Sequence, residues 1–225
     1  MNPVPRALVP ELVTRALGDS ALHLACSLLL SPFSAVASAG WISSAAGFDA
    51  EAPHPTPVVL VHGLFGHRAN FRVLGRFLVT RGFHNLATFS YAPRVDHDEL
   101  ARGLGRTIEA ACEATGATEV DVVGHSLGGL AARHLLERGR RAPVRRVVTL
   151  GAPCLTSSLP ERELAIFGAA DGIVPPPRRL RGRSAIVMGC GHLGLPFHPA
   201  VLRQVAAFLE AAEEEPVAPR LRAVA

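Results

Sequence analysis

Residues 120–130, Val-Asp-Val-Val-Gly-His-Ser-Leu-Gly-Gly-Leu, place a serine between two glycines where an apolar run meets a helical pattern. The run before Gly124 is typical of a buried strand, and the residues after Ser126 are typical of a helix. Glycines let the chain turn tightly here, where side chains would collide with the neighbouring strand and helix. The pattern therefore predicts a turn that presents the Ser126 hydroxyl at the carboxyl edge of a sheet, with an ordinary glycine turn as the alternative.

Two backbone N–H groups are candidates for stabilising the oxyanion that forms when a serine attacks a carbonyl. Leu127 offers one at the start of the predicted helix, where the partial positive charge favours an anion. Leu64 offers the other, in the glycine-flanked turn that follows the apolar run Val58–Val61. The alternative for this second turn is that His62 and Gly63 only close the strand.

A serine hydroxyl attacks at neutral pH when a histidine takes its proton and a carboxylate orients that histidine. Asp171 and His192 follow the serine in chain order, and each lies just beyond an apolar run that predicts a strand. Placement at strand ends would bring both to the sheet edge that presents the serine. Asp96 and Asp98 are the alternative acids, and His198 is the alternative base.

Apolar runs alternate with helical patterns along most of the chain. They predict strands over 58–61, 86–91, 119–123, 144–150, 164–168 and 184–188, and helices over 68–81, 97–115, 127–138 and 198–213. Strands separated by helices imply a parallel sheet with right-handed crossovers. The sequence thus predicts a three-layer α/β domain of six strands, in which the Pro-rich connections 151–163 and 169–183 can barely hold a crossover. We expect His125 to support the serine turn and His67 to lie at the surface.

Composition excludes a disordered chain, because 48% of the 225 residues are apolar and only 19% are charged. The net charge of +4 comes largely from two arginine clusters, over 138–146 and 178–183. Both flank predicted strands and lack the interleaved aromatic residues that stack on bases. We expect solvated loop ends and no nucleic-acid partner, with lipid headgroups as the remaining anionic partner.

The four cysteines, Cys26, Cys112, Cys154 and Cys190, show no Cys-x-x-Cys spacing and no zinc-finger histidine partner. The sequence therefore supports no metal or redox site. They are too few for a disulfide scaffold, although one bridge stays open.

The N-terminal region is uncharged from residue 20 to residue 48. Three interpretations stay open: a secretory signal cleaved after residues 37–39, a transmembrane helix, or a helix packed on the domain or on a membrane surface. We divide the chain into this apolar segment with a Pro-rich connector (1–55), a catalytic domain (56–212) and a flexible tail (213–225). The apolar segment favours a membrane-associated or secreted protein over a cytoplasmic one.

A family resemblance rests on five stretches in this order: PVVLVHGLFG (57–66), VDVVGHSLGGLAARHLL (120–136), VVTLGAP (147–153), FGAADGIVPP (167–176) and GCGHLGLP (189–196). Together they resemble an α/β-hydrolase of the small bacterial triacylglycerol lipase and esterase type. The resemblance implies a three-layer α/β-hydrolase fold and carboxylic ester hydrolysis without cofactor or metal. It implies a triad of Ser126, Asp171 and His192, with the N–H groups of Leu64 and Leu127 as the oxyanion hole.

The chain departs from this family in size. Many lipases insert a lid before the catalytic acid, whereas about 20 residues separate Leu150 from Asp171 here, which leaves no room for a large cap domain. Six apolar residues flank the expected site: Leu64, Phe65, Leu127, Ile173, Leu193 and Leu195. They favour short to medium acyl esters, or a lipid at a membrane surface, although several could instead face the core.

Two other classes of function stay open. A thioesterase, an acyltransferase or a cofactor-free peroxidase would use the same triad, so only substrate profiling separates these from an esterase. A non-catalytic binding module on this fold would more often lack a triad member, and none is missing here.

Overall fold

The computed structural model describes residues 47–64, 66–91, 97–137, 142–211 and 222–224. The apolar N-terminal stretch, Phe65 and Asp96 lie outside the described residues. Within the described ranges, no helix combines the length and the apolar character needed to cross a membrane.

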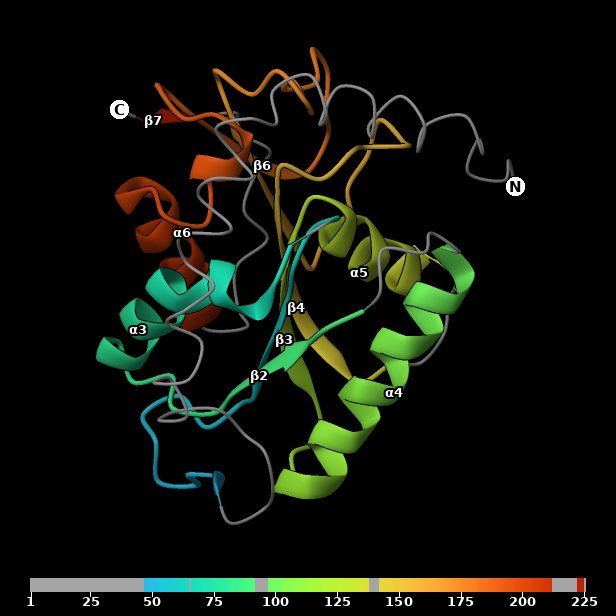
Figure 1. Ribbon diagram of the computed structural model, residues 1–225, viewed down its shortest axis with the longest axis vertical. Helices are drawn as coiled ribbons and strands as arrows, with labels where there is room; N and C mark the ends of the chain where they lie inside the picture. Colours follow the sequence, from blue (N-terminus) through green and yellow to red (C-terminus); the bar gives the residue numbers. More distant parts are fainter. Residues whose placement is uncertain (1–46, 65, 92–96, 138–141, 212–221, 225) are drawn as a thin grey trace.

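A parallel sheet of seven strands forms the centre of the molecule (Figure 1). Its strands are β1 (Val58–Val61), β2 (Leu86–Phe89), β3 (Val120–His125), β4 (Val144–Leu150), β5 (Glu163–Gly168), β6 (Arg183–Val187) and β7 (Arg222–Val224). They lie in the order β2-β1-β3-β4-β5-β6-β7, and every neighbouring pair is parallel. All four residues of β1 are fully buried, as expected for an apolar run covered on both faces.

The six predicted strands are confirmed, and a seventh is added. β7 lies in the stretch predicted as a flexible tail, and it pairs with β6. Three residues are too few to produce a periodic signal in the sequence, so the pattern could not predict this strand.

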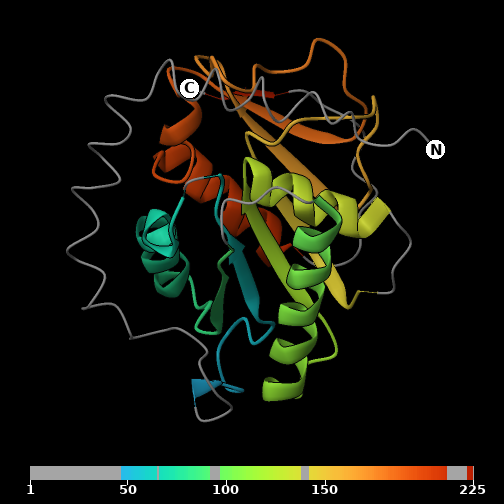
Figure 2. The same ribbon diagram turned by 45° about the vertical axis from the view of Figure 1, so that its right-hand side comes forward.

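Helices cover both faces of the sheet, which confirms the three-layer architecture (Figure 2). One face carries α3 (Arg72–Thr80) and α6 (Pro199–Glu210), and the other carries α4 (His97–Thr115) and α5 (Leu127–Glu137). Leu100, Leu104 and Ile108 recur at four-residue intervals on α4 and are buried, so this helix presents one apolar stripe to the sheet.

The first predicted helix begins with a short 3-10 turn, η3 (Arg68–Phe71). The exposed His67 caps this turn, since its ring nitrogen Nδ1 accepts a hydrogen bond from the Ala69 N–H at 3.3 Å. The predicted surface position of His67 is therefore confirmed.

The connections 151–162 and 169–182 contain no helix. Backbone hydrogen bonds tie them together: the Leu159 N–H donates to the Arg181 carbonyl and the Arg181 N–H donates to the Ser157 carbonyl, both at 2.9 Å. Leu159 and Ile173 bury an apolar cluster against Phe167 of β5. Between Leu150 and Asp171 the chain thus forms β5 and a helix-free crossover in place of a helical cap.

The arginine cluster at β4 differs from the prediction. Arg145 and Arg146 lie within β4 rather than at a solvated loop end, and Arg146 is only 7% exposed. The Arg146 guanidinium donates to the Phe208 carbonyl at 2.8 Å, and both arginines donate to the Leu209 carbonyl at 3.0 Å. They satisfy carbonyl groups that the last turn of α6 leaves without helical partners.

A buried ion pair fixes α5 to the sheet. The Arg133 Nε donates to both carboxylate oxygens of Glu163, at 3.1 and 3.0 Å, and the Thr149 hydroxyl donates to the same carboxylate at 2.7 Å. The Arg133 guanidinium also donates to the Pro153 carbonyl and to Thr149 Oγ1. Because Arg133 and Glu163 are 1% and 0% exposed, both charges depend on these partners.

The disulfide that the sequence left open is not formed among the cysteines in the described ranges. Cys112, Cys154 and Cys190 are free thiols.

Candidate active site

Ser126 occupies a strained turn between β3 and α5. Its φ of +53° lies in the left-handed region, and it is the one non-glycine residue with a positive φ in the described part of the chain. The Ser126 N–H donates to the Leu150 carbonyl at 2.8 Å, and the Ser126 carbonyl accepts from the Leu130 N–H at 3.0 Å. Strand β4 and helix α5 therefore hold the strained conformation in place.

The glycines on either side of Ser126 are required by close backbone contacts. A β-carbon at position 124 would lie 2.6 Å from the Gly129 backbone, and one at position 128 would lie 2.4 Å from the Val61 carbonyl oxygen. Any larger residue would push the helix away from β1 and β3. The glycine pattern that predicts the turn is thus explained by packing.

Asp171 and His192 are in direct contact. His192 Nδ1 lies 2.7 Å from Asp171 Oδ2, and the two residues are 7% and 4% exposed. The other carboxylate oxygen, Oδ1, accepts the N–H groups of Ile173 and Val174 at 2.9 and 2.7 Å. The carboxylate accepts, so Nδ1 carries a proton and a neutral His192 has its unprotonated nitrogen at Nε2.

The three candidate residues lie beyond the carboxyl ends of β3, β5 and β6, at one edge of the sheet. Gly151, just after β4, connects them: its N–H binds the Ile166 carbonyl at 2.8 Å, and a β-carbon on it would lie 3.0 Å from His192 Nδ1. The preceding residue, Leu150, supplies the carbonyl that binds the Ser126 N–H. The structure brings the predicted serine, acid and base to a common edge.

The alternative acid and base have other partners. Asp98 Oδ1 lies 3.0 Å from His134 Nε2, an interaction that links α4 to α5. His198 caps α6, where its Nδ1 accepts the Ala200 N–H at 3.2 Å. Neither takes the place of Asp171 or His192 in their hydrogen-bonded contact.

The predicted oxyanion turn packs against the serine. A β-carbon at Gly63 would lie 3.0 Å from Ser126 Cβ, so the backbone that leads to Leu64 runs directly beside the candidate nucleophile. Leu127 is the first residue of α5, and its N–H is one of the four that a helix leaves without an internal partner. Both N–H groups thus belong to backbone next to Ser126.

The apolar residues expected around the site divide into two groups. Leu127, Ile173 and Leu195 are buried and pack in the core clusters, as the alternative interpretation allowed. Leu64 and Leu193 are half-buried near the triad.

His125 connects the serine strand to the candidate base. Its Nε2–H donates to the His192 backbone carbonyl at 3.0 Å, and the two imidazole rings lie 4.7 Å apart. Burial lowers the pKa of His125 to about 3, so the ring stays neutral beside His192. The sequence led us to expect His125 to support the serine turn, but its hydrogen-bond partner, 67 residues along the chain, could not be predicted from the sequence.

The buried His125 should make folding stability depend on pH. Its pKa is about 3 in the folded protein and near 6.5 in the unfolded chain, so between these values only the unfolded chain binds the proton. Stability should therefore fall as pH decreases, by about 2 kcal/mol between pH 7 and pH 5 from this group. Urea unfolding at the two pH values would measure the change.

The matched control for this pH dependence is His125→Gln. Its side-chain amide still supplies an N–H donor, but it does not bind a proton between pH 5 and pH 7. Its free energy of unfolding should change by about 2 kcal/mol less than that of the wild type over the same interval. An identical pH dependence in both proteins would contradict the assignment.

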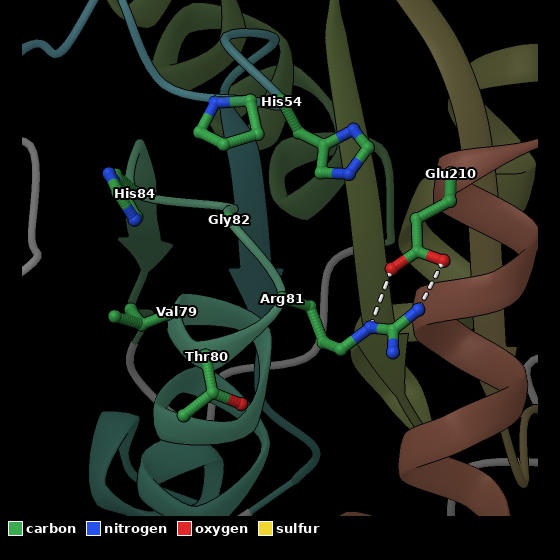
Figure 3. Close-up of a pocket in the computed structure, with 8 residues that line it drawn as sticks. His54, Val79, Thr80, Arg81, Gly82, His84 and Glu210 are labelled. Atoms are coloured by element: carbon green, nitrogen blue, oxygen red, sulfur yellow. Dashed lines mark hydrogen bonds and ion pairs between the residues drawn. The ribbon is translucent and has the colours of Figure 1, made fainter.

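A cavity of about 560 Å³ lies at the opposite edge of the sheet, where β1 and β2 begin (Figure 3). None of the triad residues lines it. Arg81, at the end of α3, donates two hydrogen bonds of 2.8 Å to the Glu210 carboxylate of α6 beside the cavity. This ion pair connects the two helices. Because no triad residue is among its lining residues, the cavity is separate from the candidate active site. In the ranges that the structure describes, no group of three His, Cys, Asp or Glu side chains could hold a metal ion.

A parallel sheet that presents a serine on a strained turn, with a buried Asp–His pair at the same edge, defines a hydrolase-like architecture. Residues 56–171 match the protein family described as alpha/beta hydrolase fold. The chain belongs to this family, which indicates a hydrolase, and the fold is consistent with a small-molecule substrate.

Solved structures share the fold. A gene product of Listeria innocua is 18% identical, with a TM-score of 0.58 over 76% of this chain and 98% of that chain. A predicted CIB-like hydrolase from Thermoplasma acidophilum is 17% identical, with a TM-score of 0.54 over 70% and 87%. A meta-cleavage product hydrolase from Pseudomonas fluorescens is 16% identical, with a TM-score of 0.52 over 68% and 90%. At these identities the likeness concerns the fold.

Proposed function

We propose that this protein is a serine hydrolase that cleaves carboxylic esters, with Ser126 as nucleophile, His192 as base and Asp171 as orienting acid. The observation that carries the proposal is the buried contact of 2.7 Å between His192 Nδ1 and Asp171 Oδ2, at the sheet edge that holds the strained Ser126. Because this contact leaves Nε2 unprotonated, His192 has the tautomer needed to accept a hydroxyl proton.

In the proposed reaction, Ser126 Oγ attacks the acyl carbon while His192 Nε2 takes the hydroxyl proton. The carbonyl oxygen becomes an oxyanion, which the N–H groups of Leu64 and Leu127 stabilise. The tetrahedral intermediate collapses, the C–O bond to the alcohol breaks, and His192 returns the proton to the leaving alcohol. Water then attacks the acyl-enzyme by the same steps, which releases the acid and restores Ser126.

The helix-free crossovers support a preference for short to medium acyl esters. The chain between Leu150 and Asp171 contains β5 and no helix that could close over the site. Half-buried Leu64 and Leu193 near the triad favour an acyl chain over a charged group. A lipid at a membrane surface is the longer substrate that a site without a helical cap between Leu150 and Asp171 would also accept.

Fluorophosphonate labelling tests the proposal, because these reagents modify serines that are activated by a neighbouring base. We expect one adduct, located on Ser126 by mass spectrometry, and hydrolysis of nitrophenyl butyrate that stops as labelling proceeds. Ser126→Ala should lose this adduct, whereas the control Ser157→Ala, which changes an exposed serine, should be labelled like the wild type. An adduct elsewhere, or complete labelling without loss of ester hydrolysis, would contradict the proposed role of Ser126.

A further inference from the structure

A third buried histidine, His62, contacts the peptide group that joins Gly63 to Leu64. His62 Nδ1 lies 2.9 Å from the Gly63 carbonyl oxygen, and the Gly66 N–H donates to the same oxygen at 3.0 Å. Because a carbonyl oxygen only accepts, Nδ1 carries the proton in this contact. Two donors therefore bind one carbonyl oxygen in the turn after β1.

These two hydrogen bonds determine the direction of the Leu64 N–H. A trans peptide group is planar, so its C=O and N–H bonds point in opposite directions. The oxygen of this group belongs to Gly63 and the N–H belongs to Leu64. Fixing the oxygen from one side fixes the N–H on the other. Hydrogen bonds at the oxygen also polarise the peptide group and strengthen its N–H as a donor.

The His62 ring is itself held in place. It stacks on Tyr91 with ring centroids 4.6 Å apart, and the Tyr91 hydroxyl donates to the His62 backbone carbonyl at 2.8 Å. Burial lowers the pKa of His62 and raises the pKa of Tyr91, so the imidazole stays neutral and the phenol stays protonated. His62 is only 4% exposed, which leaves it little freedom to turn away from the Gly63 carbonyl.

We propose that His62 is a positioning residue that directs the Leu64 N–H toward the oxyanion formed when Ser126 attacks. The inference rests on the proposed ester hydrolysis and adds a residue to it. His62 acts through the peptide group and does not touch the substrate. The location fits this role, because a β-carbon at Gly63 would lie 3.0 Å from Ser126 Cβ, so the peptide group runs beside the nucleophile.

Two substitutions at position 62 separate hydrogen bonding from packing. His62→Leu removes the donor and replaces the imidazole with an apolar side chain of similar size. His62→Asn places an amide N–H close to the position of Nδ1 and restores a donor for the Gly63 carbonyl. Loss of one oxyanion donor lowers kcat by about 10²- to 10³-fold in hydrolases, and a misdirected donor should cost less, about 10- to 100-fold.

For His62→Leu we expect kcat for nitrophenyl butyrate to fall by about 10- to 100-fold, with KM changed by less than about twofold. Affinity for a trifluoromethyl ketone, which forms a tetrahedral oxyanion on the serine, should fall by the same factor. His62→Asn should remain within about threefold of wild type in both measurements. Rates are expressed per active serine, counted by fluorophosphonate titration, so that misfolded protein does not contribute.

Wild-type ketone affinity in His62→Leu would overturn the inference and leave the proposed esterase activity standing. A wild-type protein that neither reacts with fluorophosphonate nor hydrolyses esters would instead overturn the proposed function, and the inference with it. If His62→Leu does not fold, His62→Gln replaces it, since its longer side chain carries the amide away from the Gly63 carbonyl. Full activity in His62→Gln would also overturn the inference.

Discussion

The Asp171→Asn variant is expected to lose about 10³- to 10⁴-fold in kcat while its fold and KM stay close to those of the wild type. The reason lies in how the carboxylate is held. Oδ1 accepts the N–H groups of Ile173 and Val174, so the oxygen of an asparagine must occupy that position. The amide nitrogen then faces His192 Nδ1, where Oδ2 lies in the wild type.

An amide donor in that place reverses the tautomer of His192. Nδ1 becomes the acceptor, and the ring proton moves to Nε2, the nitrogen that should take the proton of Ser126. The substitution thus removes the base while changing the shape of the site very little. Steady-state hydrolysis of nitrophenyl butyrate would measure the loss, and the rate of fluorophosphonate labelling should fall in parallel.

Two further variants give the lower limit and the control for this result. Ser126→Ala gives the activity that remains without the nucleophile, and Asp171→Asn should lie above that level. Asp98→Asn changes an acid that pairs with His134 on the helices, so it should leave kcat unchanged. A kcat within tenfold of wild type in Asp171→Asn would mean that Asp171 does not orient the base.

The positions of the candidate triad could be predicted because they follow from topology. Ser126, Asp171 and His192 each lie just beyond an apolar run, and parallel strands place their carboxyl ends at one edge. Predicting that edge requires only the alternation of strands and helices along the chain. Over residues 56–171 the family match supports the predicted architecture independently of the structure.

The contacts around these residues could not be predicted, because they join parts of the chain that are distant in sequence. The sequence indicates that His125 supports a turn, but its bond to the His192 carbonyl spans 67 residues. The stacking of His62 on Tyr91 depends on the register between β1 and β2. The sequence feature that could have pointed to these contacts was a histidine directly beside each glycine turn, in a stretch that is otherwise apolar.

Apolar character alone could not decide between the site and the core for some residues. Ile173 and Leu195 lie two and three residues from Asp171 and His192, yet they are 8% and 0% exposed and pack in the core. The arginines of β4 show the reverse case, since Arg146 is charged and buried against the end of α6. A charge cluster beside a strand therefore does not identify a solvated loop when carbonyl groups of a helix end lie within reach.

The largest effect on stability is expected at Glu163. Replacing it with methionine should lower the free energy of unfolding by about 3–5 kcal/mol, because Arg133 would remain buried without its counter-charge. Arg133 is 1% exposed, so water cannot take the place of the carboxylate. The Thr149 hydroxyl would also lose its acceptor on Glu163. Urea denaturation at pH 7 would measure the change.

Two comparisons distinguish charge burial from lost packing. In Arg133→Met/Glu163→Met both charges are absent, and replacing a buried ion pair with apolar residues is often neutral, so much of the lost stability should return. Glu210→Ala removes the ion pair with Arg81, whose side chain is 51% exposed, and should change the stability far less than Glu163→Met does. If the double variant were no more stable than Glu163→Met, the cost would arise from packing at β5. Recovery of stability would instead show that the pair acts by neutralising the buried charge of Arg133 on α5, the helix that begins directly after Ser126.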